Sequence, residues 1–463
     1  MKRKPIVVKF GGSNMKTSRD IRLIVDVIKR YETPLIVVVS ALYGLTDRLA
    51  GTVRSVKDDA GLIVRLRQFL LEAKRDIVEQ FISDPAKIKA VMDKLSVRAG
   101  ELERYLKAIH LLGQTPEFAE DLILSYGERL SSSLLESLLK AEGLDCEEVL
   151  PEDMGLVTDG EFKNASIDCA ASRAAVRRRL GRNTIHVVPG FYGISPDGKV
   201  NLLGRGGSDY SAAAIARCVE AKSLDVWKDV DGFMSADPGS VPDARPVRRM
   251  SYREASELAY FGAKILHPRT MEPLAGTGIP IRVHNINDAG AGAVSLIEEA
   301  VPAGKGGVKS VASTDRIGVL HLDGPGLGTK PGVLAKAASA LDAAGINIKS
   351  VITAQTAITI LLSDTDLAPA LKTLERLELA TVASVKGGRD AALVAAVGEG
   401  MRRRHGILAR ITGVLADEGI NIKIMASGPS EVAAYLVVRR SERRRAENAI
   451  HRALFRRRAK TAD

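Results

Sequence analysis

The sequence predicts an α/β protein: a three-layer domain with a mainly parallel sheet, followed by two small ferredoxin-like modules of βαββαβ order. Three observations support this fold class. The first forty residues alternate between strand and helix patterns, the alternation continues to about residue 300, and a motif recurs near the C-terminus at an offset of 74 residues. With 463 residues, the chain has room for two or three domains.

The N-terminal segment is predicted to be a βαβ unit. Ile6–Phe10 is rich in β-formers and ends at two glycines, and Asp20–Lys29 carries apolar residues at helical spacing. Leu35–Val39 is an unbroken apolar run, which is typical of a strand buried on both faces. Because a helix joins the two strands, they are expected to pair in parallel.

The alternation then continues along a first domain predicted over residues 1–300. A polar helical stretch over about 47–112 is expected to form an insertion packed on the sheet. Further strands and helices are predicted in the order Asp121–Ala141 (helix), Thr184–Val188 (strand), Ser211–Val219 (helix), Ser223–Val226 (strand), Tyr252–Leu258 (helix) and Ile279–Val283 (strand). A glycine-rich stretch predicts a linker at 301–312.

An internal repeat defines the two C-terminal modules, predicted at 313–386 and 387–463. Gly332-Val333-Leu334-Ala335-Lys336 is followed 13 residues after its glycine by Gly345-Ile346-Asn347-Ile348-Lys349, and Gly406 and Gly419 begin the matching pair of segments. Strand patterns lie before and after each pair of glycines, with a helical pattern between them. Two copies indicate a pair of modules packed side by side, because solenoids need three or more.

Composition restricts the classes of function. The net charge of +11 would suit nucleic acid, but aromatic residues make up only 4% of the chain, so we favour solvated arginine-rich helix faces and expect no nucleic acid partner. No apolar run reaches the length of a membrane span, and no membrane partner is expected. The three cysteines form no CxxC pair, which favours a reduced, cytoplasmic location over a disulfide framework or zinc site.

Two glycine-rich segments carry residues suited to anion chemistry. In Lys9-Phe10-Gly11-Gly12-Ser13, backbone N–H groups and one ammonium could hold a phosphate, although the segment could equally be a plain turn. In the Gly204–Ser211 loop, Arg205 could grip a carboxylate in bidentate fashion. Asp209 there could position catalytic lysines, or could simply cap the helix predicted to follow it.

Two later segments suit a nucleotide. Trp227–Pro238 ends a strand in acidic and glycine residues, and it could form either a base and ribose pocket or a hairpin with an Asp-Gly turn. In Gly262–Pro268, Lys264 could point at phosphates or lie on the surface.

Taken in order, these segments resemble one family. The motifs KFGGS, VVSALYGLTD, SYGERLSS, GRGGSDYSA, DVDGFMSADP and GAKILHP are similar to those of the aspartate kinase (aspartokinase) family, which has the amino-acid kinase fold. The repeated modules resemble the ACT domains with which that family binds feedback amino acids. The resemblance implies ATP-dependent phosphorylation of the L-aspartate side chain to 4-phospho-L-aspartate, the first step toward lysine, threonine and methionine, with ATP and Mg²⁺.

The resemblance also implies roles for individual residues. In the catalytic group, Lys9 would lie near the transferring phosphoryl group, Lys264 would face the nucleotide phosphates, and Asp209 would orient both lysines. The substrate-binding residues would be Ser40, Thr46, Glu128, Arg205 and Ser208, with Glu128 at the amino group and Arg205 at a carboxylate. The ATP-binding residues would be Lys9, Gly11, Gly12, Lys228, Asp229, Met234 and Lys264. No protein metal site is expected.

Several positions depart from the family pattern on the nucleotide side. Lys228 stands where the family usually has threonine, Met234 where a tyrosine is common, Gly239 where an arginine is common, and Asn14 where serine is usual. Lys228 could replace a lost phosphate contact, and Met234 could still cover a base through dispersion and sulfur contacts.

For regulation, the resemblance places an amino-acid effector, threonine or lysine, at Gly332, Val333, Asn347, Ile348 and Gln355. Lys349 aligns where lysine-sensitive members often carry an aspartate, and it would repel a lysine effector, so threonine is favoured. Paired ACT modules are expected to join subunits into a homodimer or homotetramer.

Two other functions stay open at this point. The chain could be a kinase of another amino-acid carboxylate, although such relatives generally lack the paired ACT modules and SYGERLSS. It could also be a catalytically weak amino-acid-sensing regulatory protein, because its nucleotide motif is altered. Lys9, Asp209 and Lys264 argue against that second alternative. The chemistry itself asks for no general base, because the substrate carboxylate is already ionised at pH 7.

Overall fold

The computed structural model describes residues 3–263, 265–290, 292–301, 307–377, 381–401, 404–428 and 430–455. Residues 302–306 of the predicted linker and the predicted catalytic residue Lys264 therefore lie outside the described residues. The chain divides into two compact units. The first comprises Met1–Phe233, Pro246–Ala259 and Lys264–Val301, and the second comprises Met234–Arg245, Tyr260–Ala263 and Pro302–Asp463.

The first unit is built on a mixed, mainly parallel sheet, as predicted. Its described strands lie in the order β3-β4-β2-β1-β7-β9-β10-β8, and the antiparallel β9–β10 pair interrupts otherwise parallel pairing. The strands are β1 (Ile6–Phe10), β2 (Leu35–Val39), β3 (Cys146–Glu148), β4 (Ile185–Pro189), β7 (Ser223–Lys228), β8 (Arg249–Ser251), β9 (Ile281–Asn285) and β10 (Ala293–Glu298). A hairpin of β5 (Tyr192–Ile194) and β6 (Val200–Leu202) stands apart from this sheet.

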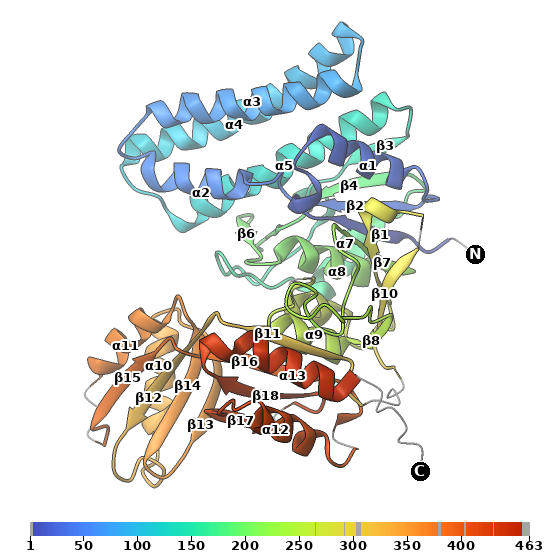
Figure 1. The fold of residues 1–463 in the computed structure, drawn as a ribbon. Coiled ribbons are helices and arrows are strands. Elements are labelled where there is room, and N and C mark those ends of the chain that lie inside the picture. The colour runs from blue at the N-terminus through green and yellow to red at the C-terminus, as the bar shows by residue number, and fades with distance from the viewer. Residues whose placement is uncertain are drawn as a thin grey trace, which may run out of the picture. The chain divides into compact units, whose positions relative to one another are not determined.

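Helices cover both faces of the sheet (Figure 1). On one face, α1 (Ser18–Ile28) packs its apolar stripe against Val8, Phe10 and the odd-numbered residues of β2. Thr17 and Asp20 form a capping box at the start of α1, which explains why the helix begins directly after the glycine turn. On the other face lies α8 (Gly207–Val219), packed against β1 and β7. Three further helices of this unit are α6 (Pro151–Met154), α7 (Cys169–Arg179) and α9 (Tyr252–Tyr260).

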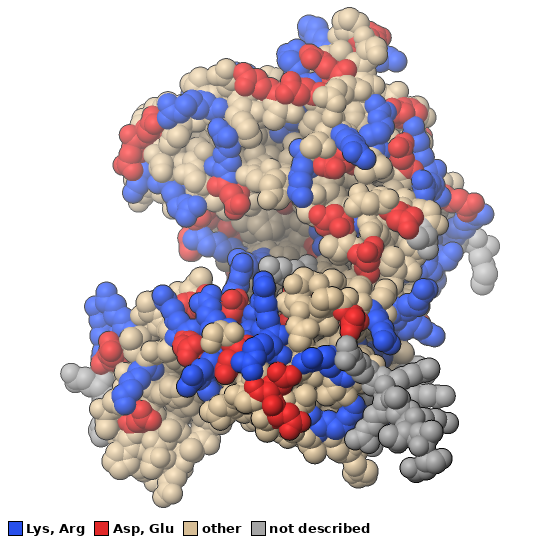
Figure 2. Space-filling model, viewed as in Figure 1, with Lys and Arg blue, Asp and Glu red and all other residues tan. Residues whose placement is uncertain are grey.

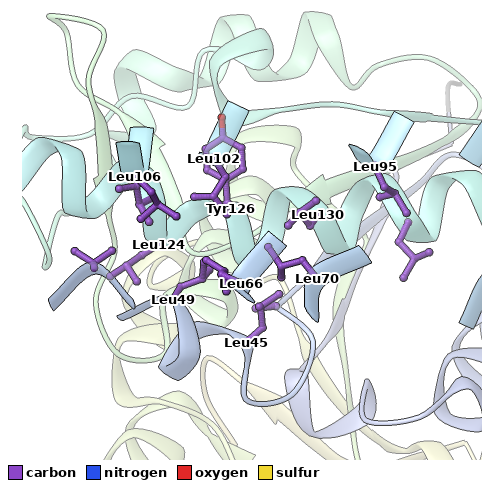
Figure 3. Packing of buried hydrophobic residues seen from close by; sticks show 14 of the residues in the cluster. Leu45, Leu49, Leu66, Leu70, Leu95, Leu102, Leu106, Leu124, Tyr126 and Leu130 are labelled. Carbon is purple, nitrogen blue, oxygen red and sulfur yellow. The ribbon is translucent and has the colours of Figure 1, made fainter. Parts of the chain in front are cut away.

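The segment predicted to be a helical insertion consists of long helices with their own core. These are α2 (Leu45–Ser55), α3 (Gly61–Phe81) and α4 (Pro85–Leu112), which pack together with α5 (Glu117–Ala141). Figure 3 shows leucines from all four helices, such as Leu49, Leu66, Leu102 and Leu130, meeting in one buried apolar cluster. This cluster holds α5 in place, and α5 carries one of the predicted substrate residues.

The second unit contains two four-stranded antiparallel sheets. In the order in which their strands pair, the first is β13-β14-β12-β15 and the second is β11-β16-β18-β17. Their elements are β11 (Ser310–Thr314), β12 (Ile317–Asp323), α10 (Val333–Ala343), β13 (Ile348–Thr353), β14 (Ala357–Ser363), α11 (Leu367–Glu375), β15 (Ser384–Gly388), β16 (Ala392–Val397), α12 (Ile407–Asp417), β17 (Ile424–Ser427), β18 (Ala433–Val438) and α13 (Arg443–Phe455).

The first module shows the predicted βαββαβ order, and the second borrows a strand. β11 precedes the first module in the chain but pairs with β16 of the second. It thus takes the edge that a strand after α13 would occupy. These residues were predicted to form the end of the linker and the start of the first module, because strand pairing across a whole module leaves no local signal in the sequence.

The repeated glycines mark matching helix ends in the two modules. Gly332 and Gly406 precede α10 and α12, and Gly345 and Gly419 follow them. All four have positive φ angles, between 66° and 86°. Glycine adopts this conformation at little cost, which is the physical reason for the repeated motif.

Basic and acidic side chains intermingle over the helical insertion on the face seen in Figure 2. On α3 and α4 they form ion pairs such as Arg75–Glu79 and Lys89–Asp93. These helix surfaces therefore carry charges of both signs rather than a continuous basic stripe (Figure 2). Among the described helices, none is long and apolar enough to cross a membrane.

Candidate active site

Two lysines and one aspartate meet above the carboxyl ends of the central strands. β1 and β7 are parallel neighbours, with Lys9 opposite Val226. Since side chains alternate between the faces of a strand, Lys228 projects from the same face as Lys9. α8 covers that face and presents Asp209 from its first turn.

Asp209 is shared by both ammonium groups. The Lys9 ammonium contacts Asp209 Oδ1, and Lys228 Nζ lies 3.3 Å from Asp209 Oδ2. The side chains are only 5%, 7% and 15% exposed for Lys9, Asp209 and Lys228. The site therefore places one buried cation, Lys9, and one partly buried cation, Lys228, beside a buried carboxylate.

The electrostatics of this cluster reflect the excess of positive charge. Burial alone would raise the pKa of Asp209, but the charges of Lys228 and Lys9 lower it to about 2. The pKa of Lys9 is lowered by burial and by repulsion from Lys228, which together outweigh its attraction to Asp209. Asp209 is thus ionised, and the cluster attracts a further anion.

The glycine turn after β1 leaves open backbone beside Lys9. A Cβ at Gly11 would lie 3.3 Å from Lys9 Nζ, and a Cβ at Gly12 would lie 2.9 Å from the Ala41 carbonyl oxygen. A side chain at either position would crowd the ammonium or the loop after β2. Bare backbone next to an ammonium suits the close approach of a phosphate.

Glu128, in the middle of α5, is a second acid close enough to Lys9 to interact with its charge. It is 3% exposed, accepts a hydrogen bond from the backbone N–H of Ala41, and feels the charge of Lys9. Burial raises the pKa of Glu128 to about 8, so its carboxyl group is mostly protonated at pH 7. Thr46 lies close to α5 here: a Cβ placed on Gly127, the residue before Glu128, would be 3.8 Å from Thr46 Oγ1. Ser40, at the start of the same loop, donates its backbone N–H to Phe10 O at 3.2 Å. The loop after β2 thus runs between Lys9 and Glu128.

The Gly204–Ser208 loop corrects one expectation. The following helix begins at Gly207 rather than Ser211, and Gly206, with φ 74°, is its N-cap. Asp209 therefore lies in the first helical turn and does not cap the helix. The earlier start was missed because Gly207 and Ser208 read locally as loop residues. Arg205 is exposed, and Ser208 is buried against Gly190 at the end of β4.

His267 is a site residue to which the sequence analysis gave no role. A Cβ at Gly206 would lie 2.3 Å from His267 Cβ, so the glycine is needed for the imidazole to pack against the loop. Burial lowers the pKa of His267, and the nearby charges include Asp209 and Arg205. Its Nδ1 accepts from Arg269 N at 3.4 Å, which holds the ring in place.

The predicted nucleotide residues are only partly brought together. Asp229 is 42% exposed and lies near the glycine turn, accepting from Ser13 Oγ at 3.5 Å. Met234 belongs to the second unit, where its carbonyl accepts from Ser310 Oγ at 2.7 Å. Lys264 lies outside the described residues, so the predicted Asp209–Lys264 contact stays a prediction.

Two further features of the site went unnoticed in the sequence. The first concerns β7, which was predicted to end at Val226 but continues for two more residues to Lys228. With the shorter strand, it was not apparent that Lys228 projects from the same face of the sheet as Lys9. Asn14 is buried beside Ser13, which donates to its Oδ1 at 3.0 Å, while its Nδ2 has no partner among the described residues. The hint for Asn14 was its departure from the usual residue in an otherwise matching motif.

The predicted effector residues fall at the two ends of the first module. The loop leading to Gly332 and Val333 contacts Gln355, because Gly328 N donates to Gln355 O at 2.9 Å. Asn347 and Ile348 lie where β13 begins, at the other end of a six-residue strand. At roughly 3.3 Å per residue, that places them about 17 Å from the Gln355 end.

The ammonium group of Lys349, on β13, is held against an aromatic ring. This ammonium lies 4.8 Å from the ring centre of Tyr260, and the Tyr260 hydroxyl donates to Lys349 O at 2.6 Å. Burial lowers the pKa of Lys349. Both residues belong to the second unit.

Comparison with known protein families gives three matches. Residues 4–285 match the amino acid kinase family, and residues 312–376 and 394–454 each match an ACT domain.

Full-length relatives include an aspartokinase of Saccharomyces cerevisiae, 28% identical over 99% of this chain and 94% of its own. Aspartokinase 1 (chloroplastic) of Arabidopsis thaliana is 30% identical over 97% of this chain and 80% of its own. A bifunctional aspartokinase/homoserine dehydrogenase of Haemophilus influenzae is 32% identical over 79% of this chain, which spans 45% of that relative. The chain thus spans about half the length of the bifunctional relatives.

Solved structures agree with this picture. E. coli aspartokinase III in complex with aspartate and ADP (R-state) superimposes with a TM-score of 0.80 at 25% identity, covering 98% of this chain and all of that one. The same enzyme in complex with lysine and aspartate (T-state) gives a TM-score of 0.79 at 25% identity, covering 97% and 99% of the two chains.

Proposed function

Because the chain belongs to the aspartokinases within the amino acid kinase family, we propose that it transfers the γ-phosphoryl group of ATP to the side-chain carboxylate of L-aspartate. The observation that carries the proposal is the cluster of Lys9, Asp209 and Glu128 above the central strands. In this cluster the Lys9 ammonium can bind a phosphoryl group, and the nearby buried carboxyl group of Glu128 can bind an amino group.

The residues supply binding and charge stabilisation rather than proton transfer. Phosphates would lie over Gly11 and Gly12, with the Lys9 ammonium on the transferring group and Lys264 as a second predicted ammonium. A bond forms between an aspartate side-chain oxygen and the γ-phosphorus as the bond from that phosphorus to the β–γ bridging oxygen breaks, releasing ADP. The carboxylate is already ionised at pH 7, so no base is required, and positioned cations stabilise the transferring group.

Magnesium fits the chemistry of the nucleotide side. Among the described residues no group of three acidic, histidine or cysteine side chains is placed to hold a metal alone. Mg²⁺ in kinases is usually held by one or two carboxylates together with phosphates, and the exposed carboxylate of Asp229 near the glycine turn suits that pattern. When bound, the ion would neutralise charge on the phosphates.

Recognition of aspartate requires an anionic group for its ammonium and cationic or polar groups for its two carboxylates. We assign the amino group to Glu128 and the α-carboxylate to Arg205, whose exposed guanidinium can bind it in bidentate fashion. Ser40, Thr46 and Ser208 would complete the pocket with hydroxyl groups. An ammonium beside Glu128 would favour the ionised form of this carboxyl group, so aspartate binding would release a proton.

We also propose feedback regulation through the ACT modules, with threonine favoured over lysine as effector. The contact of Lys349 with Tyr260 keeps a cation at the strand where a lysine effector would need an anion. This proposal includes the predicted effector residues and assembly into a homodimer or homotetramer. It also includes a role as the first step toward lysine, threonine and methionine. The cytoplasmic location, which the three free cysteines suit, is part of it as well.

The test is an acyl-phosphate assay on the full chain. Incubation with ATP, Mg²⁺ and L-aspartate in hydroxylamine should yield aspartyl hydroxamate, and glutamate or acetylglutamate in place of aspartate should not yield the corresponding hydroxamate. Faster product formation with another amino-acid carboxylate would reassign the substrate. No product from any acceptor, with effectors removed by dialysis, would favour a regulatory protein without catalysis.

A further inference from the structure

We propose that Lys228 is a further phosphoryl-binding lysine of this site, in addition to Lys9 and the predicted Lys264. Its ammonium contacts the transferring group together with Lys9, while the two carboxylate oxygens of Asp209 bind one lysine each. The inference rests on the proposed phosphoryl transfer and adds a catalytic residue to it.

The placement of Lys228 follows from the sheet. β7 lies next to β1 in parallel, and residues 226 and 228 share the face from which Lys9 projects. The same face is covered by α8, whose first turn delivers Asp209 between the two ammonium groups. Lys228 is therefore directed into the site by backbone geometry and held there by an ion pair of 3.3 Å.

The charge balance argues against a purely structural ion pair. Lys9 alone would neutralise Asp209, and the Lys228 ammonium, only 15% exposed, then adds a charge that Asp209 does not compensate. Burying an unpaired charge is costly, so such a group persists where something else balances it. The other acid close to Lys9 is Glu128, which is mostly protonated at pH 7 and leaves the excess in place. A phosphoryl group in transit is an anion that would balance it.

The neighbours of the two lysines differ, and they suggest which lysine lies toward the amino acid and which toward the nucleotide. Lys9 interacts with Glu128, on the side proposed for the amino acid. Lys228 is followed by Asp229, which lies against Ser13 of the glycine turn, on the side proposed for the nucleotide. With Asp209 between them, the two ammonium groups bracket the path from nucleotide to amino acid. That is where charge on the phosphoryl oxygens must be stabilised.

The position of Lys228 departs from the motif that this segment resembles, and this departure suggests the test substitution. The motif that this segment resembles has threonine where Lys228 stands, and threonine carries no charge. The contact of a lysine at position 228 with Asp209 is therefore a feature of this sequence, and Lys228→Thr is the natural test substitution. Lys228→Arg keeps the charge on a differently shaped group and serves as its conservative partner.

The experiment compares the full-length wild-type chain with Lys228→Thr, Lys228→Arg and Lys222→Thr. Lys222 is exposed and immediately precedes the same strand, so its replacement removes one lysine outside the site. Trp227, the single tryptophan of the chain, lies buried on the same strand and reports the folding of each variant by its fluorescence, while calorimetry reports nucleotide binding. Steady-state rates with ATP and aspartate are measured beside dissociation constants for ATP and ADP.

We expect Lys228→Thr to lower kcat about 100-fold, as losing one preorganised electrostatic partner does, with a small change in KM for aspartate. Loss of one charge-assisted contact to the terminal phosphate should weaken ATP binding at least about tenfold more than ADP binding. Lys228→Arg should recover part of both, and Lys222→Thr should match the wild type.

Two results would overturn the assignment. A kcat for Lys228→Thr within about twofold of the wild type would remove Lys228 from the reaction. Equal weakening of ATP and ADP would place it away from the terminal phosphate. The ratio of ATP to ADP affinity needs no acceptor, so it still tests Lys228 if the chain fails to phosphorylate aspartate, in which case only the proposed substrate falls.

Discussion

Glu128 offers a stringent test of the site, because its burial links stability to pH. The carboxyl group is 3% exposed and its pKa rises to about 8 from an ordinary 4.5. The folded chain therefore binds a proton that the unfolded chain releases between these values, and stability falls as pH rises through that window. Replacement by glutamine keeps the shape of the side chain and removes the ionisation.

The magnitude follows from the two pKa values. Each tenfold change in proton concentration within the window is worth about 1.4 kcal/mol, so Glu128→Gln should gain roughly 2 kcal/mol over the wild type at pH 6, about 3 at pH 7 and about 4 at pH 8. Above pH 8 the gain should level off, because the group is then ionised in both states. The increase of about 2 kcal/mol from pH 6 to pH 8 does not depend on how well the amide itself packs.

The assay is urea unfolding followed by Trp227 fluorescence at several pH values. Trp227 lies on β7 and reports on the first unit, which avoids treating a two-unit chain as one transition. Glu136→Gln is a matched control on the same helix. Glu136 is buried too, but ion pairs with Lys94 and Lys140 offset its burial and lower its pKa. That control should lose stability, with no growing gain between pH 6 and pH 8.

A flat difference between Glu128→Gln and the wild type from pH 6 to pH 8 would refute the reasoning. The linked functional result is proton release. At pH 7 aspartate binding should release up to about 0.9 proton from the wild type, measured by calorimetry in buffers of different ionisation enthalpy, and clearly less from Glu128→Gln. Release that is identical in both would show that the amino group does not meet Glu128.

Three other substitutions test separate parts of the site. Lys9→Ala should reduce turnover at least about 1000-fold without unfolding the chain, and near-normal hydroxamate formation would remove Lys9 from the mechanism. Arg205→Lys should raise KM for aspartate about tenfold at nearly constant kcat, since an ammonium cannot hold a carboxylate in bidentate fashion; an unchanged KM would place the α-carboxylate elsewhere. Tyr260→Phe removes the hydrogen bond to Lys349 O, so threonine or lysine inhibition should weaken while the uninhibited rate persists; full inhibition would show that this contact does not transmit it.

Local patterns in the sequence predicted most elements well, because each had one dominant signal. The unbroken apolar run of β2, the helical periodicity of α1 and the repeated glycines around α10 and α12 were all confirmed. Errors occurred where an element extends into residues with loop-like chemistry. Gly207 and Ser208 begin α8, and Trp227 and Lys228 complete β7.

Those boundary errors had chemical consequences. Moving the start of α8 four residues toward the N-terminus turns Asp209 from a cap into a side chain aimed at the sheet. Extending β7 by two residues places Lys228 beside it. The raised pKa of Glu128 could not be predicted, because burial in the middle of α5 depends on the packing of the helical insertion.

The division of the chain into units bears on how the regulatory part could influence catalysis. Segments 234–245 and 260–263 lie within the first 300 residues, yet they group with the ACT modules. The first is tied there by Ser235 Oγ to His451 Nε2 at 2.8 Å and the second by Tyr260 to Lys349. One begins six residues after Lys228, and the other ends directly before Lys264. We expect a displacement of the modules to be transmitted along the chain to the residues next to two proposed phosphate-binding lysines, because these segments are covalently continuous with them.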